Sequence, residues 1–116
     1  MKVAIGDVEE DALARVGADL AAAGVEVFTA PLDVTDPAQM DAFADATLDR
    51  FGAVHVFANN AGVGGGGLSW EAPLATWEWV LGVNLWGVIH GLRAFVPILL
   101  EQDEAHIVNT ASVAGL

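Results

Sequence analysis

The chain contains 116 residues, of which 54% are hydrophobic and 17% charged, and it has no cysteine. This composition is that of one globular domain with a buried core, near the lower size limit of a doubly wound α/β fold. The formal net charge of −12 repels nucleic acid and anionic lipid, so we expect neither as a partner. The absence of thiols excludes disulfides and thiolate metal sites.

The N-terminus lacks the charge pattern of a secretory signal. A brief apolar run over residues 1–6 is followed by acidic residues instead of a longer hydrophobic segment. The most apolar part of the chain, residues 79–92, is interrupted by Asn84 and His90 and is too short for a membrane span. We therefore expect a cytoplasmic protein without membrane contact.

Short apolar runs predict four strands, and stretches with helical spacing separate them. The predicted strands cover residues 2–6, 25–31, 54–58 and 106–110. The first predicted helix follows the first strand, carries acidic residues in its first turn and stops at Gly24.

Helix signals are clearest after the second strand. Thr35 or Asp36 is the expected N-cap, Pro37 suits the first helical position, and Gly52 ends the helix. A third helical region extends from about residue 74 to 102, with glycines and a proline that weaken or kink it. Its apolar residues cover most of its circumference, so we expect the sheet on one face and another subunit on the other.

The resulting order of elements is β-α-β-α-β-α-β. This order is typical of a parallel sheet with helices on both faces, a Rossmann-like doubly wound α/β fold. No internal repeat or linker divides the chain, so residues 1–116 are treated as one domain.

Polar residues follow two of the predicted strands. Asn59-Asn60-Ala61-Gly62 stops the third strand abruptly, and Asp7 follows the first. Ligands bind at the carboxyl ends of strands in such sheets, so we hypothesise a nucleotide-cofactor pocket at these residues. Asp7 suits two roles equally well by position, binding ribose hydroxyls or capping the following helix.

A G-x-G-x-x-G pattern occurs at Gly62, Gly64 and Gly67. We reject it as a phosphate loop, because residues 69–73 separate it from the next helix and no strand-terminal acid follows about 20 residues later. A mobile loop beside the pocket is the better interpretation.

Two further polar residues have open interpretations. Asn84 lies in an apolar helical run, either as a hydrogen-bonded structural amide or as a residue that holds an active-site water. Ser112, just beyond the last strand, is either a cap or a substrate-contacting hydroxyl. The three histidines show no metal-ligand spacing, so we expect no metal site.

Together, these motifs resemble the short-chain dehydrogenase/reductase family over essentially the whole chain. The resemblance implies cofactor-binding roles for Asp7, Asp33, Val34, Asn60, Ala61 and Gly62, and catalytic roles for Asn84 and Ser112. Asn59 belongs to the same N-N-A-G signature, and Ala111 stands where the family often has a first serine.

The resemblance implies an NAD(P)-dependent oxidoreductase that transfers hydride between a nicotinamide cofactor and a small alcohol or carbonyl substrate. NAD is the expected cofactor because Asp7 would repel a 2′-phosphate, although NADP is not excluded. A homo-oligomer through the long helix is also expected. The alternative is a non-catalytic nucleotide-binding or subunit-interaction module.

By this resemblance, residues 1–116 are an internal part of an NAD(P)-binding Rossmann domain. The family's opening strand and T-G-x-x-x-G-x-G loop would precede Met1, and its Y-x-x-x-K motif would follow Leu116. The opening strand would lie between the strands at 2–6 and 54–58. Without it we expect the sheet to close the gap or expose two edges, and the isolated chain to be unstable or to aggregate.

Overall fold

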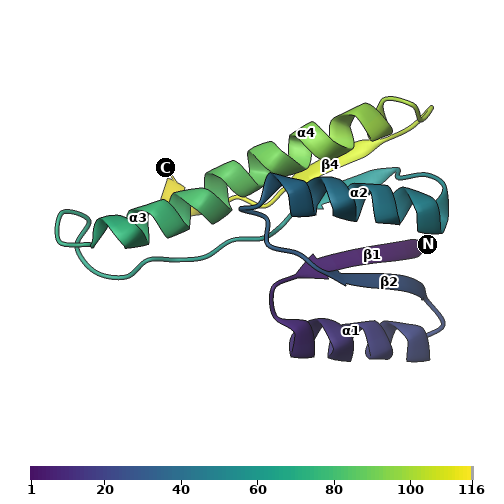
Figure 1. Ribbon diagram of the computed structural model, residues 1–116, viewed down its shortest axis with the longest axis horizontal. Coiled ribbons are helices and arrows are strands. Elements are labelled where there is room, and N and C mark those ends of the chain that lie inside the picture. Colours follow the sequence, from purple (N-terminus) through teal and green to yellow (C-terminus); the bar gives the residue numbers. More distant parts are fainter. Residues whose placement is uncertain (116) are drawn as a thin grey trace.

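The computed structural model describes residues 1–115 (Figure 1). Its elements are β1 (Lys2–Asp7), α1 (Glu10–Ala22), β2 (Glu26–Pro31), α2 (Pro37–Phe51), β3 (Val56–Asn59), α3 (Leu74–Leu81), a π-helical segment (Gly82–Trp86), α4 (Gly87–Leu99), β4 (His106–Asn109) and a 3-10 turn (Val113–Gly115). The predicted order of strands and helices is confirmed. The third strand begins two residues later than predicted, and the fourth ends one residue earlier.

The four strands form two separate two-stranded parallel sheets. β1 pairs with β2 from Lys2 opposite Glu26 onward, and β3 pairs with β4 from Val56 opposite His106 onward. All four strands run in the same direction, and β1 and β3 are the inner strands on either side of a gap (Figure 1). Of the two outcomes expected for a sheet without its central strand, the structure adopts the one with two open edges.

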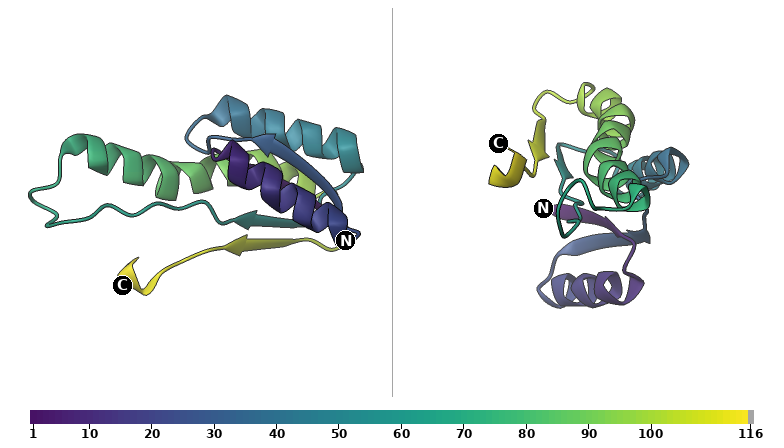
Figure 2. Two further views of the ribbon diagram at one scale, coloured as in Figure 1. Left: turned by 90° about the horizontal axis from the view of Figure 1, so that it is seen from below. Right: turned by 90° about the vertical axis from the view of Figure 1, so that its left-hand side faces the viewer.

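Helices α1 and α2 cover opposite faces of the β1–β2 sheet (Figures 1 and 2). On β2, Phe28 stacks on Phe43 of α2, with ring centroids 6.2 Å apart. The next residue, Thr29, faces α1, where a Cβ added to Gly17 would lie 3.0 Å from Thr29 Cγ2. Successive strand residues point to opposite faces, which is why one strand serves both helices.

Helix α2 begins and ends where its sequence predicts. Of the two expected N-caps the structure uses Asp36, whose Oδ1 accepts hydrogen bonds from Ala38 N at 2.9 Å and Gln39 N at 3.4 Å. Gly52 ends the helix at φ +79°, a left-handed conformation that glycine adopts without a steric penalty. The position of this helix end therefore fixes where the chain enters β3.

The core lies between α2, α4 and β3. Phe57 of β3 stacks on Phe95 of α4 with ring centroids 4.2 Å apart, and Phe95 is only 2% exposed. The helix approaches this closely because position 91 is a glycine, where an added Cβ would lie 2.7 Å from Phe57 Cζ. The buried cluster comprises Leu32, Met40, Ala44, Val54, Phe95 and Leu99.

The third strand is less buried than predicted. Its residues alternate between the α4 side and the opposite side, where Val56 remains 55% exposed. The apolar run of residues 54–57 predicts a buried strand, and this prediction is wrong for Val56, because no element among residues 1–115 covers that side.

Residues 74–99 form one continuous helical stretch of 26 residues, with the π-helical segment in its middle. By length and composition alone this stretch could cross a membrane, so the prediction that the apolar residues 79–92 are too short for a span does not hold for the longer helix that contains them. Core helices of globular proteins share such a composition, and α4 packs on α2 and β3.

The long helix is covered on one face only within residues 1–115. Its buried positions are Gly87, Gly91, Phe95 and Leu99, which follow one another at four-residue steps. Large apolar residues on its other faces are exposed, among them Leu74, Trp77, Trp79, Leu81, Leu85 and Trp86. The faces of this helix that we expect another subunit to cover are thus exposed in the described part of the chain.

Candidate functional site

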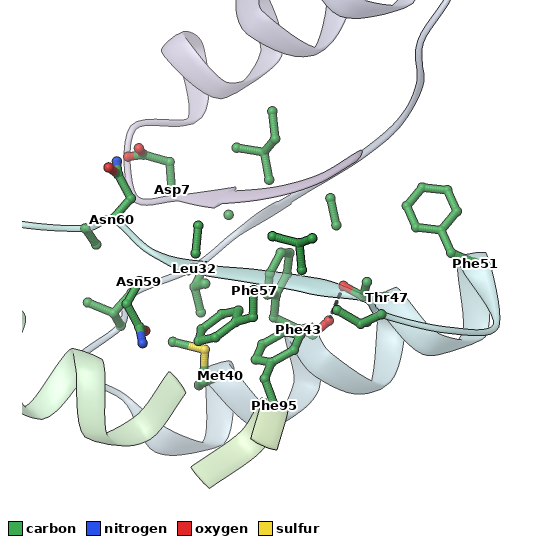
Figure 3. A pocket seen from close by; sticks show the side chains of 18 of the residues that line it. Asp7, Leu32, Met40, Phe43, Thr47, Phe51, Phe57, Asn59, Asn60 and Phe95 are labelled. Atoms are coloured by element: carbon green, nitrogen blue, oxygen red, sulfur yellow. Dashed lines mark hydrogen bonds between the residues drawn. The ribbon is translucent and has the colours of Figure 1, made fainter. Parts of the chain in front are cut away.

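A cavity of about 720 Å³ lies between the two sheets (Figure 3). Four of the predicted cofactor residues, Asp7, Val34, Asn60 and Ala61, line it. Figure 3 shows Asp7 and Asn60 at one end of the cavity and Phe51 at the other. The polar end is formed by residues at and after the carboxyl ends of β1, β2 and β3, where the sequence places the hypothesised pocket.

Asp7 combines features of both roles that the sequence left open. Its Oδ1 accepts a hydrogen bond from Glu9 N at 2.9 Å, which holds the turn before α1 although Glu9 is the formal N-cap residue. The carboxylate is exposed, and within residues 1–115 its other oxygen, Oδ2, has no hydrogen-bond partner. One oxygen is therefore available to bind a hydroxyl.

Asp33 organises the loop after β2 and does not line the cavity. Its Oδ1 accepts from both Thr35 N at 2.9 Å and Thr35 Oγ1 at 2.7 Å, and its own N–H donates to Gln39 Oε1. These bonds tie the loop to the start of α2. Asp33 thus fixes the backbone that carries Val34 to the cavity wall.

Val34 is held against the long helix by contacts that sequence reasoning missed. His90 Nδ1 lies 2.9 Å from Val34 O, and a Cβ added to Gly87 would lie 2.7 Å from Val34 Cγ2. The two residues of the hydrogen bond are 56 positions apart in the chain. The only sequence signal for this contact was the presence of a histidine in a largely apolar helical run.

The carboxyl ends of β3 and β4 are joined by two side-chain hydrogen bonds. Asn59 Nδ2 donates to Asn109 Oδ1 at 2.9 Å, and Thr110 Oγ1 donates to Asn60 Oδ1 at 2.9 Å. Asn59 is buried, so its amide requires such a partner. Asn109 and Thr110 were not predicted as site residues, and their only sequence signal was their place at the end of a strand.

Asn84 holds the glycine-rich loop through both ends of its side chain. Val63 N donates to Asn84 Oδ1 at 2.8 Å, and Asn84 Nδ2 donates to Val63 O at 2.8 Å. The side chain thus imitates the pairing of a neighbouring strand. Of the two interpretations of Asn84, the hydrogen-bonded structural amide is realised in this structure, although the residue is exposed.

Gly62 lies beside this contact and outside the cavity lining. A Cβ added there would lie 3.6 Å from Asn84 Oδ1. The glycine-rich loop does not open a helix directly, since α3 begins only at Leu74. The rejection of this loop as a phosphate-binding turn is consistent with that spacing.

Ser112 caps the turn that follows β4. Its Oγ accepts a hydrogen bond from Ala114 N at 3.2 Å, and its side chain is exposed. The capping interpretation is therefore realised in this structure. Neither Ser112 nor Asn84 lines the cavity that brings the four cofactor candidates together.

Residues 1–115 contain no group of three or more histidine, aspartate or glutamate side chains placed to hold a metal ion. His90 binds the Val34 carbonyl. The polar end of the cavity is built from a carboxylate, amides and backbone.

Comparison with known proteins places the chain in a family. A family profile described as short chain dehydrogenase matches residues 1–116. The chain therefore belongs to the short-chain dehydrogenase/reductase family, as its motifs predicted.

Among curated relatives, it is 43% identical to 1-deoxy-11-beta-hydroxypentalenate dehydrogenase of Streptomyces exfoliatus, over 97% of this chain and 42% of that protein. It is 35% identical to the CLA biosynthesis dehydrogenase/reductase of Lactiplantibacillus plantarum, over 100% of this chain and 41% of that protein. The chain thus spans about two fifths of the length of these relatives.

Solved structures confirm the Rossmann-like fold. A short-chain dehydrogenase/reductase from Burkholderia phymatum in complex with NAD is 57% identical, with a TM-score of 0.96 over 99% of this chain and 41% of that one. An actinorhodin polyketide ketoreductase variant with NADPH is 33% identical, with a TM-score of 0.93 over 98% of this chain and 44% of that one.

Proposed function

We propose that residues 1–116 form part of the cofactor-binding domain of an NAD(P)-dependent oxidoreductase acting on a small alcohol or carbonyl compound. The observation that carries this proposal is that Asp7, Val34, Asn60 and Ala61 all line a single cavity. These are residues for which the family resemblance implies contact with the adenosine half of the cofactor.

The residues present fit a nicotinamide dinucleotide. Asp7 offers Oδ2 to the ribose hydroxyls, and the loop fixed by Asp33 presents Val34 to the adenine. Asn60, Ala61 and Gly62 form the turn on the ribose side, steadied by the bond between Thr110 and Asn60. When bound, the nicotinamide supplies or accepts the hydride.

NAD is the cofactor that the charge around the cavity favours. The only lysine or arginine among the lining residues is Lys2, at the opposite end of β1 from Asp7. A 2′-phosphate beside Asp7 would therefore meet a carboxylate and no compensating cation. Relatives of solved structure include complexes with NAD and with NADPH, so the family alone does not decide this point.

The catalytic proposal assigns roles to two residues of this chain and requires at least one further residue outside it. Ser112 would position the substrate oxygen, and Asn84 would help to hold a water in the proton relay. Asn84 already uses one donor and one acceptor on Val63, so its side chain keeps one N–H and one lone pair for that task. The 116 residues contain no tyrosine, so a tyrosine acid/base has to lie outside them.

The partners we propose are a small-molecule substrate and a second copy of the protein. The exposed apolar faces of α3 and the π-helical segment support an oligomer contact, because large apolar patches on soluble proteins mark interfaces.

Calorimetric titration with NAD and NADP of the complete protein that contains residues 1–116 tests the proposal. Asp7→Asn keeps an acceptor for Glu9 N and removes the charge, so NAD should bind about tenfold more weakly, a change of about 1.4 kcal/mol. The preference for NAD over NADP should shrink. Asp11→Asn is the matched control, an exposed acid on α1 that should leave both affinities unchanged. An unaltered ratio of the two affinities in Asp7→Asn would remove Asp7 from the site.

A further inference from the structure

The long helix changes its hydrogen-bond pattern in the middle, at the π-helical segment Gly82–Trp86. The N–H of Gly87 donates to Gly82 O, five residues back instead of the four of an α-helix. A single π turn inside an α-helix is rare, so contacts with other parts of the protein have to stabilise it.

Asn84 lies within this segment and depends on its geometry. Val63 N donates to Asn84 Oδ1, and Asn84 Nδ2 donates to Val63 O, both at 2.8 Å. An α-helix turns by about 100° per residue, so an α-helical turn in place of the π turn would rotate Asn84 relative to the buried positions of α4. The π turn therefore lets Asn84 face the glycine-rich loop while α4 packs on β3.

The loop after β2 contacts both ends of the segment (Figure 1). A Cβ added to Gly87 would lie 2.7 Å from Val34 Cγ2 and 3.1 Å from Val34 Cβ, so the valine fills the space that a side chain at position 87 would need. At the other end, a Cβ added to Gly82 would lie 3.5 Å from Thr35 Cγ2. His90 Nδ1, 2.9 Å from Val34 O, adds a polar contact beyond the segment.

This loop has a fixed conformation of its own. Asp33 Oδ1 accepts hydrogen bonds from Thr35 N at 2.9 Å and Thr35 Oγ1 at 2.7 Å, which orient the threonine side chain. Val34 also lines the cavity, whereas Asn84 does not. Val34 is thus in contact with the candidate cofactor site and with the helical segment that carries Asn84.

We propose that Val34 and Thr35 are positioning residues for Asn84, and that the adenosine half of the cofactor orders Asn84 by binding against their loop. A ligand that restricts the motion of a loop also lowers the entropic cost of ordering the groups packed on it. The inference rests on the proposed function in one respect, namely that the adenosine half binds at Val34.

The test uses the complete protein that contains residues 1–116 and AMP as the probe. AMP carries the adenosine half of the cofactor and lacks the nicotinamide. Calorimetry measures AMP binding, and NMR follows hydrogen exchange of the Val63 amide, whose acceptor is Asn84 Oδ1. Saturating AMP should slow this exchange about threefold or more in the parent protein.

A matched pair of glycine variants tests the contact between the loop and the helix. Gly87→Ala forces a methyl group into the place of Val34 Cγ2, so Val63 should exchange about fivefold faster without AMP, and AMP should no longer slow it. Gly82→Ala makes the same change at the other end of the segment, where the methyl group meets Thr35 at an ordinary contact distance. Its exchange rate should stay within about twofold of the parent, with the effect of AMP retained.

Val34→Ala provides a second variant should Gly87→Ala fail to fold. It keeps the carbonyl that contacts His90 and removes the methyl groups that fill the space beside Gly87. AMP at saturation should then leave Val63 exchange unchanged. The double variant Gly87→Ala/Val34→Ala should exchange more slowly than Gly87→Ala, because the two side chains no longer collide.

The amide of Leu13 on α1 is the internal reference, since its N–H donates to Glu9 O far from the long helix. A general loss of stability would accelerate exchange at Leu13 and Val63 together, whereas a loss of positioning accelerates Val63 alone.

Three results would overturn the inference. The first is AMP that binds the parent without slowing Val63 exchange. The second is equal behaviour of Gly87→Ala and Gly82→Ala. The third is an AMP effect that persists in Val34→Ala, which would assign it to direct contact with the turn at residues 60–62. If neither AMP nor NAD binds, the proposed function fails, and the exchange rates of the two glycine variants without ligand still decide whether the loop positions Asn84.

Discussion

His90 and Val34 connect the long helix to the loop that borders the cofactor end of the cavity. His90 Nδ1 lies 2.9 Å from Val34 O, and the imidazole is half-buried. Val34 lines the cavity, whereas His90 does not. The histidine therefore acts on the candidate site through the backbone of another residue.

Replacing His90 should loosen that loop. His90→Phe keeps an aromatic ring but leaves Val34 O without its partner, which should cost about 1–3 kcal/mol of unfolding free energy. NAD affinity should fall severalfold, because the loop would no longer be held in one position. Urea denaturation and calorimetric titration measure the two effects. His106→Phe, an exposed histidine on β4, is the control, and equal losses in both variants would contradict the role of His90.

Asn84 should control the order of the glycine-rich loop. Asn84→Ala removes both hydrogen bonds to Val63, so the Val63 amide should exchange at least tenfold faster with solvent. Asn84→Asp keeps the acceptor for Val63 N but sets a carboxylate against Val63 O, so we expect an intermediate rate. Amide exchange by NMR checks the order of the three rates. Equal rates in the parent and Asn84→Ala would show that the contact does not hold the loop.

Gly91 should tolerate no side chain. A Cβ there would collide with Asn59 Oδ1 and lie 2.7 Å from Phe57 Cζ, so Gly91→Ala should destabilise the fold by about 1–3 kcal/mol. Gly64→Ala is the matched control, because a Cβ at position 64 meets no atom within 4 Å. Urea denaturation of both variants measures the difference. A Gly91→Ala variant as stable as Gly64→Ala would contradict the close approach of α4 to β3.

The N-cap of α2 should contribute measurably to stability. Asp36→Ala removes the acceptor for Ala38 N and Gln39 N, at a cost of about 1 kcal/mol. Asp41→Ala changes the same charge at an exposed position inside the helix, where no cap is lost. Thermal denaturation compares the two variants, and a cost no larger for Asp36→Ala than for Asp41→Ala would assign the effect to charge alone.

Local signals in the sequence determined much of this protein. The cap at Asp36, Pro37 and Gly52 fixed α2, because capping bonds span only two or three residues. Alternating apolar runs and helical spacing gave the order of strands and helices. The N-N-A-G turn and Asp7 marked strand ends, and the carboxyl ends of parallel strands meet at one edge of a sheet. The family and the polar end of the cavity could be predicted on that basis.

Only the tertiary structure decided how distant residues meet. The hydrogen bonds between Asn84 and Val63, between Asn60 and Thr110, and between His90 and Val34 join residues that are 21, 50 and 56 positions apart in the chain. Such contacts depend on how helices cross the sheets, and the periodicity of a single element does not encode that. The resemblance left two outcomes for β1 and β3, a closed gap or two open edges, and only the placement of the four strands decided between them. Local propensity specified the individual strands and helices, whereas long-range packing specified which of their polar groups face one another.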